Sequence, residues 1–311
     1  MNLPPRLVSH LLLACAIVAP CALAQNSSRI TRHPIRGPLH WIDGAVDVVG
    51  VSAGPDGVLL VDIGYPETFA ALNRAIVELG HGTPKLLINT HWHHTFANFE
   101  LQGRVPIIAH RNVWERLGHA DTMYNRLVPE APSASRPTIT FDDSLTLHFN
   151  GEAITVLHLP RAHTDGDVAV IFEQSHVAFA GDVIVTGIPS TDYPTGGTLR
   201  GLVAAVDRLL ARLPHDAIVV PGHGKPMTYE EVEGYRSMLS GIIDSISARR
   251  GARETMAESR QQGIPAPWRS YPRVLPDEFV LDNLYEGLEG WMSGRPQIPG
   301  ASPSPSRARL R

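Results

Sequence analysis

Three histidines within four positions give this chain its clearest chemical signal. His91, His93 and His94 come directly after a short apolar run at residues 86–88. If that run is a buried strand, it holds the backbone rigid while the loop after it aims the imidazole rings. Neutral imidazole is the commonest metal ligand in proteins, and two histidines two positions apart can bind one ion. A polar turn whose histidines bond water or the backbone is the alternative interpretation of the same residues.

The other polar motifs share one property with this one, because each follows an apolar segment that we expect to be a strand. They are Asp62-Ile63-Gly64, His163-Thr164-Asp165-Gly166-Asp167, Gly181-Asp182 and Pro221-Gly222-His223-Gly224. Taken singly, each has an ordinary structural explanation, such as a helix cap or a turn. Together, strand ends that carry His and Asp can converge on one rim, and this predicts a metal site.

Apolar runs and turn signals predict two similar series of strands and helices, one in each half of the chain. Strands are expected at residues 44–53, 58–62, 85–89, 105–109, 145–149, 153–159, 168–172, 177–180 and 217–220, and helices at residues 68–79, 112–117, 201–213, 229–249 and 277–288. A strand–helix–strand unit at residues 58–89 indicates a crossover between parallel strands. The most economical packing is an α/β fold of the αββα type, with two facing mixed β-sheets and helices outside.

The composition describes a globular protein and excludes some classes of partner. The chain has 311 residues, of which 43% are hydrophobic and 19% charged. Its formal net charge of −4 comes with no basic stripe, which argues against nucleic-acid binding. We expect a small-molecule substrate as its partner, while the sequence leaves the oligomeric state open.

The first 24 residues have the pattern of a signal peptide. Arg6 precedes an apolar run at residues 7–23, and Ala22-Leu23-Ala24 provides a small-x-small cleavage pattern before Gln25. We therefore expect a signal peptide at 1–24, a leader at 25–43, one domain at 44–288 and a disordered tail at 289–311. A periplasmic or secreted protein without stable membrane insertion after cleavage would result. A lipoprotein that begins at Cys15 is the alternative.

Cleavage after Ala24 would remove both cysteines of the chain, Cys15 and Cys21. The mature protein would then have no disulfide and no thiolate for a metal. Any metal site must consist of histidines and carboxylates.

From about residue 44 to residue 224 the chain resembles the metallo-β-lactamase superfamily of metallohydrolases. The helical segment to about residue 288 resembles the tail of its periplasmic, sulfur-oxidation-type branch. The matching motifs are Asn89-Thr90-His91-Trp92-His93, Ala109-His110, Ala162-His163-Thr164-Asp165-Gly166-Asp167, Ala180-Gly181-Asp182, Tyr193-Pro194 with Gly196-Gly197, and Val219-Val220-Pro221-Gly222-His223-Gly224. The resemblance implies one zinc on His91, His93 and His163. It implies a second zinc on His223 and on an Asp and a His of the first motif, with Asp182 bridging both.

The first motif departs from the family pattern HxHxDH. Read without a gap, Thr95 replaces the aspartate and Phe96 replaces the last histidine. Read with a two-residue deletion, His94 becomes that last histidine, and this alignment is favoured because the residues after it also match. The aspartate is missing in either alignment, so we expect one tightly bound Zn²⁺ and a second that is weak or absent.

The resemblance implies a zinc-dependent hydrolase in which a metal-bound hydroxide attacks an ester, thioester, lactam or similar bond. Asp182 would hold metal and water, and His223 would support the second metal. The expected metal ligands are thus His91, His93, His94, His163, Asp182 and His223. The alternative is a pseudo-enzyme, in which the same fold serves as a metal- or ligand-binding protein.

Overall fold

The computed structural model describes residues 30–123, 126–273 and 275–288. The expected signal peptide with Cys15 and Cys21, the start of the leader and the tail at 289–311 lie outside these residues. Among the described residues, no helix is both long and apolar enough to cross a membrane.

The first half of the chain forms a seven-stranded sheet in the order β1-β2-β3-β4-β5-β6-β9. Its strands are β1 (Thr31–Pro34), β2 (Leu39–Ala45), β3 (Asp47–Gly54), β4 (Gly57–Val61), β5 (Pro84–Ile88), β6 (Ile107–His110) and β9 (Ile139–Phe141). Strands β1 to β4 are antiparallel neighbours, whereas β4, β5, β6 and β9 run parallel. The predicted parallel crossover is present, because helix α1 (Pro66–Val77) connects β4 to β5. Residues 31–43, which were expected to belong to a leader, instead form β1 and most of β2.

The second half forms a six-stranded sheet in the order β10-β11-β12-β13-β14-β15. Its strands are β10 (Ser144–Phe149), β11 (Glu152–His158), β12 (Val168–Phe172), β13 (Val177–Phe179), β14 (Ile218–Val220) and β15 (Met227–Thr228). Only β13 and β14 are parallel, so this sheet is also mixed. A separate short hairpin joins β7 (Asp121–Met123) to β8 (Arg126–Val128).

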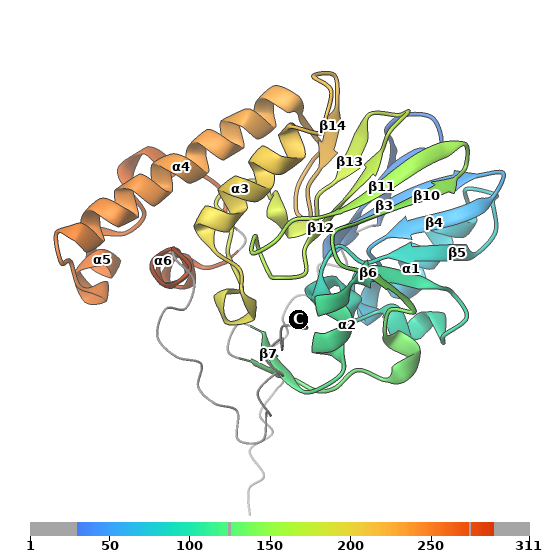
Figure 1. Cartoon of the computed structure of the whole chain (residues 1–311), viewed down its shortest axis with the longest axis horizontal. Helices are drawn as coiled ribbons and strands as arrows, with labels where there is room; N and C mark the ends of the chain where they lie inside the picture. Colours follow the sequence, from blue (N-terminus) through green and yellow to red (C-terminus); the bar gives the residue numbers. More distant parts are fainter. Residues whose placement is uncertain (1–29, 124–125, 274, 289–311) are drawn as a thin grey trace, which may run out of the picture.

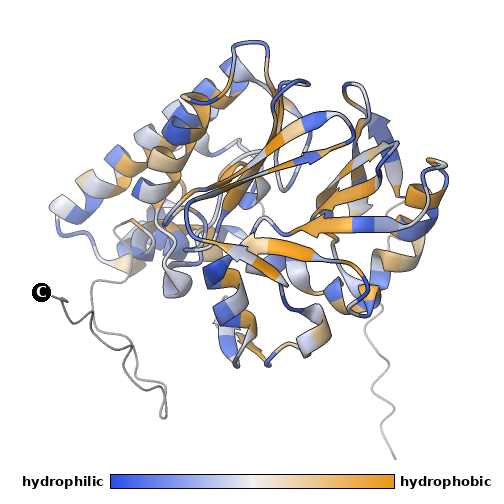
Figure 2. Cartoon of the chain, turned by 45° about the vertical axis from the view of Figure 1, so that its right-hand side comes forward, coloured by the Kyte–Doolittle hydropathy of each residue, from blue (hydrophilic) through white to orange (hydrophobic). Residues whose placement is uncertain are grey.

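Alternating side chains hold the layers together. In β4, Leu59 and Val61 point into the core between the two sheets, whereas Leu60 packs on the outer face toward α1. In β12, Phe172 enters the core between the sheets and Ile171 contacts the helices on the other side. Each such buried side chain contributes about 1.5–3 kcal/mol relative to exposure, which favours this one register of the strands. Figure 2 shows the resulting apolar colouring along the strands.

The helices cover the two outer faces of the sandwich. Helices α3 (Leu199–Leu210), α4 (Tyr229–Gly251) and α6 (Asp277–Glu286) pack on the second sheet, with α5 (Met256–Gln262) beside α6 (Figure 1). Helix α1 packs on the first sheet, and α2 (Arg111–Leu117) lies at the end of β6. Four layers result, which confirms the αββα sandwich.

Candidate metal centre

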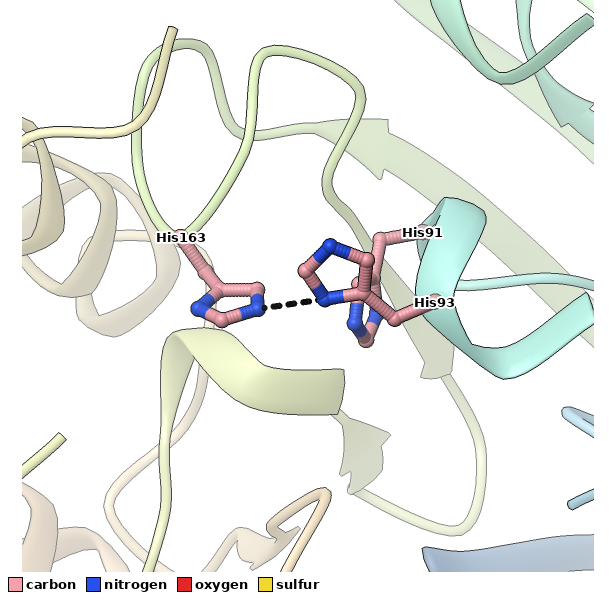
Figure 3. Close-up of side chains that lie close together, drawn as sticks. All are labelled: His91, His93 and His163. Atoms are coloured by element: carbon pink, nitrogen blue, oxygen red, sulfur yellow. Dashed lines mark hydrogen bonds between the residues drawn. The ribbon is translucent and has the colours of Figure 1, made fainter. Parts of the chain in front are cut away.

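Three predicted histidines meet at one point of the rim (Figure 3). His91 and His93 come from the turn after β5, and His163 from the loop after β11. One ring nitrogen of each lies within 4.8 Å of those of the other two. Nδ1 of His93 is 3.0 Å from Nε2 of His163. All three side chains are buried.

Outer partners fix which nitrogen of His93 and which nitrogen of His163 faces the centre. Nε2–H of His93 donates to Asp192 Oδ2 at 2.9 Å, which leaves the Nδ1 lone pair directed toward His163. Nδ1–H of His163 donates to the Ser190 carbonyl at 2.9 Å, which leaves its Nε2 lone pair directed toward His93. Such partners orient metal-binding histidines and raise their basicity.

A second group of ligand atoms lies beside the first. Asp47, His94 and His223 each offer one atom within 4.8 Å of the others, and His91, His94 and Asp182 form an overlapping group. Nε2 of His94 lies 3.4 Å from Asp47 Oδ1 and 3.6 Å from Asp182 Oδ1. Nε2 of His223 lies 3.6 Å from Asp47 Oδ1 and 3.4 Å from Asp182 Oδ2.

Asp182 stands between the two groups. Its Oδ2 lies 3.7 Å from Nε2 of both His91 and His163, in addition to the contact with His223. Its place depends on a glycine, because a Cβ on Gly222 would lie 2.0 Å from Asp182 Oδ1. One carboxylate thus reaches both halves of the site.

Asp62 supports the histidine turn from behind. Its two oxygens accept hydrogen bonds from Thr90, at 2.8 Å from the amide and 2.6 Å from the hydroxyl. Its Oδ2 also accepts from Nδ1–H of His94 at 3.1 Å, which leaves Nε2 of His94 facing the centre. The strand-end position of Asp62 therefore has an orienting role.

The two groups differ in their protonation. Burial lowers the pKa of His91 well below its usual value and that of His93 to about 4, so both rings are neutral near pH 7. Burial also opposes a charge on His94, but Asp47 and Asp182 outweigh it and raise the pKa of His94 to about 10. A metal at the second group must therefore displace a proton from His94.

The donor atoms fit a divalent metal. Nε2 of His91, Oδ2 of Asp47 and Oδ1 of Asp182 are buried and make no hydrogen bond. Buried polar atoms without a partner are costly and rare in native proteins, and cations bound at the two groups would give these atoms partners. Imidazole and carboxylate together suit zinc and similar transition metals.

Residues of both groups line one pocket. Its wall is mostly apolar or aromatic, and its described lining contains no Lys or Arg: Val46, Asp47, Tyr65, His93, His94, His163, Asp182, Val185, Ser190, His223 and Leu275.

The structure brings all six predicted metal ligands together and adds two residues that the sequence analysis did not single out. Asp47 was hidden within an expected apolar strand, and Asp192 lies in a loop without a strand-end pattern. Thr95, which replaces the aspartate in the ungapped alignment, donates a hydrogen bond to the Trp92 carbonyl instead of joining the site.

Comparisons with known proteins agree with this fold. Residues 43–223 match the family model described as the metallo-beta-lactamase superfamily. The chain is 28% identical over 155 residues to the hydroxyacylglutathione hydrolase GloC of Haemophilus influenzae, covering 46% of this chain and 70% of that protein. A metallo-beta-lactamase from Pontibacter korlensis has a similar structure, with a TM-score of 0.55, 20% identity and coverage of 68% and 99%. The sec-alkylsulfatase Pisa1 from Pseudomonas sp. gives a TM-score of 0.59 at 14% identity, with coverage of 88% and 52%.

Proposed function

The chain belongs to the metallo-β-lactamase superfamily, and from this we propose that it is a zinc-dependent hydrolase of small carbonyl compounds. The observation that carries the proposal is the pair of adjoining ligand groups that share Asp182. Three histidines alone would suit a structural metal as well. A carboxylate that reaches both groups and lines a pocket suits catalysis.

A bound metal would supply an activated water nucleophile near pH 7 and polarise the carbonyl of the substrate. The residues of the chain have separate tasks around it. His91, His93 and His163 would hold the first metal, and hydrogen bonds to Asp192 and Ser190 orient the rings of His93 and His163. Asp182 would hold metal and orient the nucleophile, and His223 would support the second position.

The pocket wall favours an uncharged substrate. Val46, Val185 and Leu275 offer apolar contacts, and Tyr65 adds an aromatic ring. The described lining residues include no Lys or Arg to pair with a phosphate or carboxylate. We therefore favour neutral esters, thioesters or lactams over phosphate esters and strongly anionic compounds.

Metal content and turnover test the proposal together. Elemental analysis of the purified protein should show bound zinc, and hydrolysis of a panel of neutral esters, thioesters and lactams should stop with chelator and return with added Zn²⁺. His163→Ala should lose the three-histidine metal and the activity, whereas His119→Ala, at an exposed side chain, should change neither. A protein that binds zinc but hydrolyses nothing would favour the metal-binding alternative. A protein without affinity for zinc would refute the proposal.

We also propose export to the periplasm or outside the cell, in keeping with the sulfur-oxidation-type branch. The Ala22-Leu23-Ala24 pattern motivates this proposal. Mass analysis of the exported protein should give an N-terminus at Gln25, and a lipidated Cys15 or a retained Met1 would contradict it.

A further inference from the structure

The missing aspartate of the first motif leaves the second metal position short of one anionic ligand. Family members place that aspartate between the second and third histidines of HxHxDH, and this chain has no residue there, since His93 and His94 are adjacent. The remaining ligands around this position are His94, His223 and the shared Asp182. A fourth donor is needed to complete a tetrahedral site without solvent.

Asp47 lies where such a donor is needed. Its Oδ1 is 3.4 Å from Nε2 of His94 and 3.6 Å from Nε2 of His223. Its side chain is buried, and its other oxygen, Oδ2, makes no hydrogen bond. A buried carboxylate oxygen without a hydrogen-bond partner is costly, and a cation bound between Asp47 and the two imidazoles would provide that partner.

The fold explains how Asp47 reaches the site from a distant part of the sequence. Strand β3 runs antiparallel to β4, so its first residue lies at the edge where β4 ends, beside Asp62 and Gly64. A hydrogen bond at 2.9 Å from the Val48 amide to the Gly222 carbonyl ties the start of β3 to the loop of His223. This hydrogen bond fixes the position of Asp47 relative to His223.

We propose that Asp47 is a direct ligand of the second metal and replaces the aspartate that the first motif lacks. The second position then has the set Asp47, His94, His223 and Asp182, with the same charge as the usual family set. The shortened motif is therefore a relocated ligand set, and the protein binds two zinc ions. This inference rests on the proposed function, since it specifies a ligand of the same centre.

Zinc stoichiometry and affinity of Asp47→Asn test the inference. The parent should bind two Zn²⁺ per chain, whereas Asp47→Asn should bind one with parental affinity. The affinity for the second Zn²⁺ should fall further than it does when a hydrogen-bond partner of a ligand is lost, which costs about 10- to 100-fold. Asp43→Asn is the matched control, because it removes the same charge from the adjoining strand at a side chain that is 45% exposed. It should keep both ions.

Each other outcome overturns the inference in a distinct way. Two tightly bound ions in Asp47→Asn would make Asp47 only an ion-pair partner of His94. A single ion in the parent would mean that Asp47 does not complete a site, although the proposed hydrolase could still stand. No ion in the parent would refute the hydrolase as well. If Asp47→Asn does not fold, Asp47→Glu replaces it, and its longer side chain should weaken the second ion alone by at least tenfold.

Discussion

The carboxylate of Asp192 determines which nitrogen of His93 is available to a metal. It accepts the Nε2 hydrogen at 2.9 Å and is fully buried, so the hydrogen bond is not weakened by water. The Nδ1 lone pair then points to the centre. This arrangement matches the carboxylate–histidine–metal triad that is common in zinc sites.

Replacing this carboxylate should weaken the first metal. Asp192→Asn keeps the size of the side chain but removes its charge, so the His93 ring becomes less basic. We expect the affinity of the three-histidine position to fall by about 10- to 100-fold. Competition with a chromophoric chelator measures this affinity, and Asp207→Asn, on the exposed side of α3, serves as the control. An unchanged affinity would mean that Asp192 only packs against the ring.

At the residue scale, the sequence predicted those ligands that belong to a polar motif directly after an apolar strand. The chain leaves the sheet at such a position, so the side chains there lie at the rim. His163 and Asp182 are of this kind. Asp47 was not predicted because it is the first residue of its strand, whereas the predicted ligands follow the ends of strands. Its position could have been inferred from the hairpin turn at Gly54-Pro55-Asp56-Gly57, which sets the register of β3 on β4. Asp192 had no such signal, since only the packing of its loop brings it to His93.

Among the elements, the turn between β2 and β3 has a strained backbone next to the site. Val46 has a φ of 76°, a left-handed conformation that is unfavourable for a β-branched residue. Its side chain is 62% exposed, so burial does not compensate for the strain. The turn reverses the chain and sets Asp47 at the head of β3, where it can face the ligands.

Relieving this strain should stabilise the protein without moving the site. Asn adopts the left-handed region more readily than Val, so Val46→Asn should raise the free energy of unfolding by about 1 kcal/mol. Urea denaturation of parent and variant measures the difference. Val77→Asn, at a 48% exposed valine at the end of α1, should not stabilise. A loss of stability in Val46→Asn would show that the valine side chain makes a needed contact at the pocket.

Helix α2 starts at a histidine whose protonation the fold disfavours. His110 caps the helix, because its side chain accepts from the Asn112 amide at 3.2 Å, and its ring stacks on His158 with centroids 3.6 Å apart. Burial, followed by repulsion from His158, lowers the pKa of His110 to about 4. In the unfolded chain this histidine has an ordinary pKa near 6.5. Between about pH 6.5 and pH 4 it is therefore protonated in the unfolded chain but neutral in the folded chain. Stability must fall as the pH falls through that window.

His110→Asn should reduce this acid sensitivity. Asn keeps an N-cap acceptor but cannot titrate, so the loss of stability between pH 6.5 and pH 4 should be smaller than in the parent. Urea denaturation of both metal-free proteins at several pH values compares the slopes, with His119→Asn as the exposed control. Parallel curves for parent and His110→Asn would contradict the lowered pKa.

For the molecule as a whole, the sandwich was predictable because its strands are short apolar runs between clear turns. β12 has the predicted bounds, and the main helices start or end within a few residues of the expected positions. Several short or edge elements were not predicted, and two of them show the physical reason. β1 has an exposed, polar sequence at the edge of a sheet, and α5 is a seven-residue helix stabilised by the capping box of Thr255 and Glu258. Neither has the apolar periodicity on which such predictions depend.

Several strand ends meet at one rim of the sandwich. A ligand at a given position of the site can therefore come from more than one strand. The carboxylate of the second metal can come from the start of β3, as we propose, or from the turn after β5, as in the HxHxDH pattern. In the Asp47→Asn background, inserting Ser-Asp between His93 and His94 recreates HxHxDH. The new carboxylate should bring back the second zinc, since an anion offsets the repulsion between two cations held about 3.5–4 Å apart.

Two further variants make this exchange decisive. Inserting Ser-Asn in the same background lengthens the turn equally but adds no charge, so it should stay at one zinc per chain. Inserting Ser-Asp with Asp47 intact should not raise the count above two, because the second position already has its carboxylate. If that insertion instead raises the parent from one zinc to two, the short motif is a degraded site that Asp47 does not repair. If the Ser-Asp insertion fails to restore the ion in Asp47→Asn, the two carboxylates are not equivalent, and the turn holding His94 does not tolerate the longer motif.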